Sequence, residues 1–152
     1  MAISNETYNK SNNVVSVALN RFSSKYSTSV LECGDNSSYA IRRPIAQSLI
    51  DYLCDKFKVS RLNVVVSDRC RPNKGRSQTY GYYQRINGCG SVIVVYNRSS
   101  HRGHITSIKS FYDTLLHEFM HHYDFEVLKL DNSLHTSGFF QRIGDLKVKL
   151  TK

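Results

Sequence analysis

Hydrophobic positions recur with the period of an α-helix in three parts of the chain. Over 44–57, which begins at a proline suited to a first helical turn, apolar residues return every four positions and predict an amphipathic helix. A second apolar stripe predicts a long helix over 106–125, and a third predicts a helix over 137–148. The residues 129–134 are expected to connect the last two helices.

Three other segments have the composition of β-strands. The β-branched run 62–66 predicts a buried strand, and the Tyr-rich segment 79–86 and the apolar segment 91–96 predict two more. Asn87-Gly88 lies between the last two and is a strong signal for a tight turn, so these strands are expected to form a hairpin. The order of elements predicts an α+β domain with a short mixed sheet packed on helices.

The N-terminal part of the chain lacks such periodicity. Residues 1–40 are rich in Ser and Asn, and we expect them to be loosely structured, which leaves 41–152 as the folded domain. The first residues do not combine a basic start with a long apolar core, and no nearby apolar stretch could span a membrane. These features lead us to expect a cytoplasmic, monomeric protein without a signal peptide or membrane anchor.

Composition supports a folded globular chain and excludes some cysteine chemistry. Hydrophobic residues make up 40% of the 152 residues and charged residues 22%, as in ordinary globular domains. The four cysteines include no CxxC pair, which argues against a four-cysteine zinc ribbon and a thioredoxin-like motif. Four cysteines could form two disulfides, but reduced thiols are expected in an intracellular protein.

The net charge of +9 favours anionic partners such as nucleic acid. The densest group of basic residues falls in an expected loop over 68–77, which contains Pro and Gly. Its members, the candidates for contact with DNA, are Arg69, Arg71, Lys74 and Arg76. The alternative is a protein that is simply basic, because the chain has no long Lys/Arg run of the kind found in nucleic-acid arms.

The candidate chemistry lies in the segment His117-Glu118-Phe119-Met120-His121. A separation of four residues places both histidines on one face of a helix, where they can bind one metal ion. Zinc is the expected metal, because neutral imidazole is a preferred zinc ligand. Glu118 is displaced by about 100° around the helix, where it can activate a zinc-bound water instead of binding the metal. The alternative is that these are ordinary polar residues of a helix surface.

A catalytic zinc site uses three protein ligands and keeps one position for water. His135, beyond a connection long enough to fold back, is the leading third ligand. Asp145, a carboxylate of the following helix, is the competing one. His122 points about 100° away from His121, so it is not expected to bind the same metal.

Three further residues are candidates for supporting roles. Ligating histidines usually donate their second ring nitrogen to an acceptor such as a carboxylate. Asp113 lies one turn before His117, and Asp124 lies three residues after His121, so either could be that acceptor. Tyr123 is a candidate for polarising a substrate carbonyl. The alternative for the two aspartates is surface charge.

The residues HEFMHHYD, followed by HTSGFF, resemble the SprT-like zinc metallopeptidases. Members of that family carry HExxH on a helix and then a third His, with an aromatic residue four positions later, here Phe139. A softer match is the Gly-containing strand TYGY followed by an apolar strand that ends at Asn97. The resemblance covers about 44–148. Members often have Gly directly after the third His, where this chain has Thr136.

This resemblance implies a zincin-like fold with its active-site helix over about 106–125. It implies one zinc ion per chain, bound by His117, His121 and His135, with Glu118 as the general base. It also implies a hairpin whose edge strand can pair with an extended peptide substrate.

The expected function is therefore that of a zinc-dependent metalloendopeptidase, which hydrolyses peptide bonds with a zinc-bound water activated by Glu118. Its partner would be a protein or peptide substrate. The alternative is a basic, nucleic-acid-associated protein with a zinc site and little hydrolytic activity. Peptidase activity and nucleic-acid binding would both be present in a DNA-guided protease. A zinc amidase acting on cell-wall peptides is a third reading.

Overall fold

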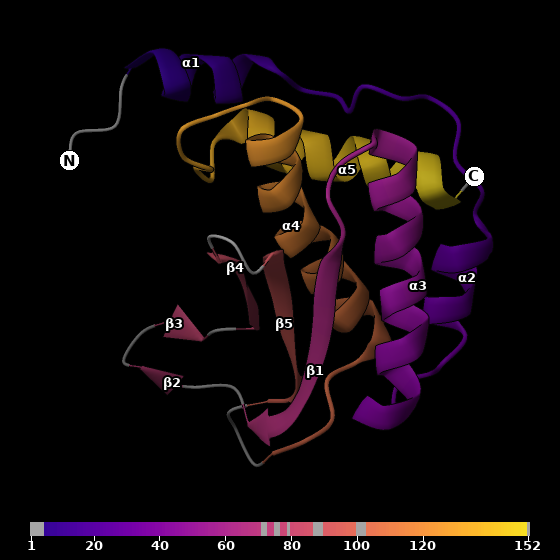
Figure 1. Ribbon diagram of the computed structural model, residues 1–152. Helices are drawn as coiled ribbons and strands as arrows, with labels where there is room; N and C mark the ends of the chain where they lie inside the picture. The colour runs from indigo at the N-terminus through magenta and orange to yellow at the C-terminus, as the bar shows by residue number, and fades with distance from the viewer. Residues whose placement is uncertain are drawn as a thin grey trace.

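A computed structural model describes residues 5–70, 73–74, 77–78, 80–86, 90–99 and 103–151. The helices and strands are, in chain order, α1 (Asn5–Asn13), α2 (Lys25–Leu31), α3 (Tyr39–Phe57), β1 (Leu62–Cys70), β2 (Asn73–Lys74), β3 (Ser77–Gln78), β4 (Gly81–Ile86), β5 (Gly90–Arg98), α4 (Ile108–Glu126) and α5 (Ser137–Thr151). Figure 1 shows the helices gathered beside a small sheet, with α5 crossing near one end of α4.

The main sheet has three strands in the order β1-β5-β4. β1 runs parallel to β5, and β4 runs antiparallel to β5, so the sheet is mixed as expected. The predicted hairpin between β4 and β5 is confirmed, although its turn, 87–89, lies outside the described residues. β4 therefore forms one edge of the sheet.

The helices cover one face of this sheet, and β1 shows which face that is. In β1 the side chains of Leu62, Val64 and Val66 are buried, whereas those of Asn63 and Val65 between them are exposed. This alternation is that of a strand with one face against a core. The buried face packs against α3 and α4. The mixed α and β architecture agrees with the expected α+β class.

The predicted helices are present, with shifted boundaries. α3 begins five residues earlier than predicted, because the side chain of Ser38 accepts a hydrogen bond from the backbone of Ile41 and caps the helix. Pro44 consequently lies inside α3 rather than at its first turn. α4 is capped in the same way by Ser107, whose hydroxyl accepts from the backbone N–H of Ser110.

The N-terminal segment differs from its expected loose structure. Its described residues contain α1 and α2, and α1 lies along α5. The hydroxyl oxygens of Ser11 and Thr136 lie 2.9 Å apart, and Lys10 donates to the carbonyl of Leu128 at 2.6 Å. Polar contacts hold α1 in place instead of an apolar stripe, which is why the hydrophobic pattern did not reveal it.

The expected loop over 68–77 also contains regular structure. β1 continues to Cys70, and β2 and β3 form a two-stranded antiparallel pair. The three described cysteines, Cys33, Cys54 and Cys70, are free thiols. Within the described ranges, no helix is long and apolar enough to cross a membrane.

Candidate metal centre

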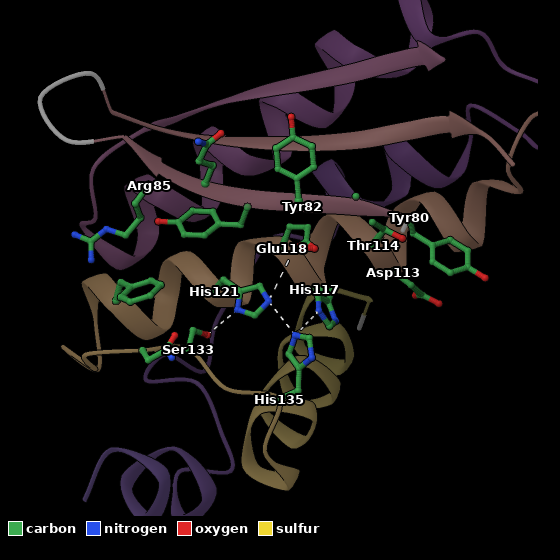
Figure 2. A pocket seen from close by; sticks show the side chains of 15 residues that line it. Tyr80, Tyr82, Arg85, Asp113, Thr114, His117, Glu118, His121, Ser133 and His135 are labelled. Atoms are coloured by element: carbon green, nitrogen blue, oxygen red, sulfur yellow. Dashed lines mark hydrogen bonds and ion pairs between the residues drawn. The ribbon is translucent and has the colours of Figure 1, made fainter. Parts of the chain in front are cut away.

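Two elements bring three histidine side chains together. His117 and His121 project from one face of α4, and His135 reaches them from the connection that precedes α5 (Figure 2). One ring nitrogen of each lies within 4.8 Å of the other two. The Nε2 atom of His135 is 3.2 Å from that of His117 and 3.1 Å from that of His121.

This arrangement fits a tetrahedral metal ion. Nitrogen ligands at the usual zinc distance of about 2.0–2.1 Å would lie about 3.3 Å from one another in a tetrahedral site. The separations from His135 are close to that value. His117 and His121 are half-buried while His135 is exposed, so one side of the cluster faces solvent. Three nitrogen donors with an open fourth side are the donor set of a catalytic zinc site.

The surroundings keep the two helical histidines neutral, the form that binds metal. Burial lowers the pKa of His117 to about 4, with a further contribution from His135. Burial also lowers the pKa of His121 to about 3, helped by the two neighbouring imidazoles. Both side chains are therefore available as lone-pair donors throughout the neutral pH range.

Glu118 lies beside the cluster without belonging to it. Its Oε1 atom is 3.9 Å from Nε2 of His121, and the residue is only 6% exposed. Burial raises the pKa of this carboxyl to about 7. A carboxylate with a pKa near neutrality can both accept and return a proton, which is what a general base requires.

A chain of hydrogen bonds fixes the orientation of His121. Its Nδ1 atom is 2.7 Å from the hydroxyl of Ser133, which donates to a carboxylate oxygen of Asp124 at 2.8 Å. Because the hydroxyl proton points to Asp124, the oxygen accepts from Nδ1–H of His121. The neutral imidazole then carries its lone pair on Nε2, the atom that faces the other two histidines.

These hydrogen bonds continue into the protein interior through Arg142. Both Asp124 and Arg142 are fully buried, and the guanidinium binds both carboxylate oxygens at 2.9 and 3.0 Å. Burial raises the pKa of Asp124, and the charge of Arg142 and the bond from Ser133 oppose that rise. Arg142 also donates to the carbonyls of Ser11 and Val14, at 2.6 Å each. The metal-facing imidazole is thus connected to α1.

Phe139 supports the three imidazoles from below. Its ring is fully buried, and its centroid lies 5.1, 4.8 and 5.1 Å from those of His117, His121 and His135 respectively. An aromatic ring in contact with all three histidines limits the positions that they can adopt. The hydroxyl oxygen of Thr136 accepts a hydrogen bond from the backbone N–H of Phe139 at 3.0 Å, which fixes the start of α5.

Three other candidate residues, Asp145, Tyr123 and Asp113, lie apart from the cluster or have other partners. The carboxylate of Asp145 accepts from the backbone N–H of Val17 and from Lys149, away from the histidines. Tyr123 is buried, and its hydroxyl accepts from the backbone N–H of Ala18, so it does not face the site.

Asp113 borders the site but pairs with Lys147 at 2.5 Å. His122 is buried between Tyr83 and the carbonyl of Ser60, pointing away from the cluster as expected.

The predicted basic candidates do not contribute described contacts to the site. Arg69 is exposed near the end of β1, and Lys74 lies in β2. Arg71 and Arg76 lie outside the described residues.

No family model, curated protein sequence or solved structure matches this chain. Its chemistry must therefore follow from the side chains that surround the cluster.

A cleft of about 870 Å³ opens over the histidines, between β4, α4 and the connection before α5. Gly81 brings β4 close to α4: a Cβ atom there would lie 2.5 Å from the carbonyl oxygen of Val94 and 3.0 Å from Cγ2 of Thr114. Figure 2 places Tyr80 and Asp113 at one end of the cleft and Arg85 and Ser133 at the other, with the histidines between them.

Sequence reasoning missed Ser133, Arg142 and Arg85 at this site. Asp124 could be proposed because it follows His121 by three residues on one helix. Ser133 belongs to an irregular connection, and no spacing rule predicts the direction of its hydroxyl. Arg142 had a detectable signal, since it lies three residues after Phe139 on the apolar side of a helix.

Proposed function

We propose that the protein is a zinc-dependent metalloendopeptidase of the SprT-like, zincin type. The observation that carries this proposal is the convergence of three imidazole Nε2 atoms at the floor of an open cleft, with Glu118 beside them. The site would take one zinc ion per chain, held by His117, His121 and His135. When bound, zinc supplies a Lewis acid and lowers the pKa of a coordinated water to about 7.

Glu118 performs the proton transfers in this proposal. Its raised pKa of about 7 lets the carboxylate accept a proton from the attacking water and then give it to the leaving amine. Its burial keeps bulk water from competing for the same oxygen atoms. The hydrogen bonds through Ser133 hold His121 in the tautomer that leaves the lone pair of Nε2 free.

The edge strand β4 supplies the means to hold an extended peptide. The backbone N–H of Tyr96 donates to the carbonyl of Tyr80 at 3.0 Å, and the register continues with Gly81 opposite Val95. In an antiparallel ladder these bonds alternate. The backbone groups of Gly81, Tyr83 and Arg85 therefore point to the free edge, where a substrate can add as a further strand.

Replacement of Glu118 by Gln tests the mechanism. We expect the variant to bind as much zinc as the parent, because Glu118 is not a ligand, and to lose at least a hundredfold in cleavage of a casein-like substrate. Metal analysis and a peptide-release assay measure the two quantities. The exposed Glu32→Gln variant is the matched control, and cleavage by Glu118→Gln at the parental rate would disprove the assigned role.

Metal analysis of His135→Ala tests the third ligand. We expect its zinc content or affinity to fall, because two imidazoles remain. Asp145→Ala should retain zinc, since that carboxylate bonds Val17 and Lys149. The opposite pattern would reassign the third ligand.

The net charge of +9 supports a second candidate, a nucleic-acid-associated protein that uses its zinc site for structure. It predicts binding to duplex DNA that weakens steeply as salt rises. Absence of binding at low salt would remove this candidate.

A further inference from the structure

We infer that Arg85 makes this cleft selective for peptides with an acidic side chain on the amino-terminal side of the cleaved bond. The inference rests on the proposed peptidase function and adds the substrate class. Arg85 is the only Lys or Arg among the described residues that line the cleft. Its position, its contacts and its lack of an acidic partner each bear on this role.

The guanidinium of Arg85 is held over an aromatic platform. Its Cζ atom lies 4.7 Å from the ring centroid of Phe125, which follows His121 by one helical turn. Tyr83 stacks on the same ring, with centroids 6.2 Å apart and an interplanar angle of 19°. A cation above an aromatic face is stabilised in that position, so the charge is held beside Phe125 at this end of the cleft instead of moving freely in solvent.

Arg85 is not neutralised by a neighbouring carboxylate. No Asp or Glu oxygen within the described ranges lies within 4.0 Å of its guanidinium. The pKa of Glu126 is lowered mainly by the hydrogen bond that its carboxylate accepts from Ser60, and Arg85 is the smallest of the contributing causes. At the opposite end of the cleft, Asp113 is already paired with Lys147. The positive charge at Arg85 is therefore available to a ligand.

The direction of the strand decides on which side of the cleaved bond the acidic residue lies. β4 follows Tyr80, which lies near the Asp113 end of the cleft, and runs to Arg85 at the other end (Figure 2). A peptide added antiparallel to β4 runs the opposite way, so its residues before the scissile bond lie beside Arg85. Tyr83 faces His121, with ring centroids 6.3 Å apart. Arg85 lies two residues, about 7 Å, further along, beside the second or third residue before the bond.

Digestion of a proteome-derived peptide library by the zinc-loaded protein tests the inference. We expect Asp and Glu to be enriched at the second or third residue before the cleaved bonds. Two synthetic peptides that differ only by Glu or Gln at that position should differ in kcat/KM about fivefold, as expected for an ion pair that is partly exposed. Arg85→Gln should bring the two values together, and Arg85→Glu should favour a Lys peptide.

Arg43→Gln is the matched control, because Arg43 is an exposed arginine of α3, away from the cleft, and should leave the preference unchanged. Binding to zinc-loaded Glu118→Gln gives a readout that does not need turnover, and fluorescence anisotropy should show the same preference for the Glu peptide. Cleavage without acidic enrichment, enrichment after the bond, or a preference that survives Arg85→Gln would overturn the inference. Failure of the parent to cleave any peptide, with the binding preference intact, would instead overturn the proposed function.

Discussion

The hydroxyl of Ser133 connects an imidazole of the histidine cluster to a buried carboxylate. It accepts from Nδ1–H of His121 and donates to Asp124, so a single oxygen atom determines which ring nitrogen keeps its lone pair. Removal of this atom would leave both neighbours in place but unconnected. In the proposed zinc site the residue would therefore act through His121 rather than by direct contact with the metal.

Ser133→Ala should weaken zinc affinity about 10- to 100-fold, the usual effect of losing such a supporting bond. Competition with a chelator of known affinity measures the change. Ser133→Thr, which keeps the hydroxyl, should recover most of it. Ser48→Ala, which removes an exposed serine hydroxyl from α3, is the control and should bind zinc like the parent.

Glu118 should reduce the stability of the metal-free protein at alkaline pH. Its pKa is raised from 4.5 to about 7 in the folded state, so the folded protein binds this proton more tightly than the unfolded chain. Stability is then lost as pH rises from 4.5 through 7. Glu118→Gln should gain roughly 3 kcal/mol over the parent at pH 8 and little at pH 4. Urea unfolding in the presence of a chelator measures both, and an equal gain at the two pH values would contradict the assigned burial.

The histidine residues shift stability in the opposite direction. Burial lowers the pKa values of His117 and His121 from 6.5 to about 4 and about 3, so the unfolded chain binds these protons more tightly. The stability of the folded state that depends on their being neutral is fully present above pH 6.5, and it is lost as pH falls between 6.5 and about 3. The metal-free Glu118→Gln protein, in which the carboxyl no longer titrates, should therefore lose stability steadily below pH 6.5 in the same urea experiment.

Individual residues were predictable where a regular helix sets the spacing. His117 and His121 share a face because they are four residues apart, and Asp124 lies near them by the same geometry. Tyr123 does not face the histidine cluster, because its position on α4 lies on the side of the helix that packs against the core. The spacing in the sequence did not show which side that is. Burial of the Tyr123 ring against Phe57 shows that this position belongs to the core.

At the scale of elements, the apolar stripes and the turn signal located every strand of the main sheet and the three longest helices. α2 was missed because it is only seven residues long and buries few apolar side chains, chiefly Val30. α1 was missed because its stability does not come from a hydrophobic face. The two buried residues of α1, Thr7 and Ser11, are polar. Only the position of α5 against α1, a contact distant in sequence, explains why these residues form a helix.

The packing of α1 on α5 depends on Gly138. A Cβ atom at this position would collide with the backbone carbonyl of Ser11 and lie 2.6 Å from that of Asn12. Gly138→Ala should displace α1 and lower the melting temperature. It should also weaken zinc binding, because Arg142 joins α1 to the hydrogen bonds that orient His121. We expect the free energy of unfolding to fall by about 1–3 kcal/mol, as is typical of overpacking.

Gly144 of the same helix supplies the matched control for that experiment. No atom lies within 4 Å of a Cβ at Gly144, so Gly144→Ala should be neutral or stabilise the helix by up to about 1 kcal/mol. Thermal unfolding and zinc titration of both variants compare them. Equal behaviour of the two alanine variants would mean that the contact with α1 does not support the site.

At the scale of the whole molecule, the charge of +9 should attract acidic peptides over a distance. Salt screens such attraction. The kcat/KM for the peptide with Glu should therefore fall more steeply between about 20 and 300 mM salt than that for the peptide with Gln. Parallel salt dependences for the two peptides would show that the charge acts on neither their approach nor their binding.

The bonds between Arg142 and the carbonyls of Ser11 and Val14 also constrain when the protein can become active. They join residues 131 and 128 positions apart, and closing loops of such length slows folding. During synthesis, α1 leaves the ribosome long before α5 exists. A nascent chain therefore cannot form these bonds, which complete the hydrogen-bonded support of His121, until α5 has emerged, and the proposed metal site would be completed only after that point.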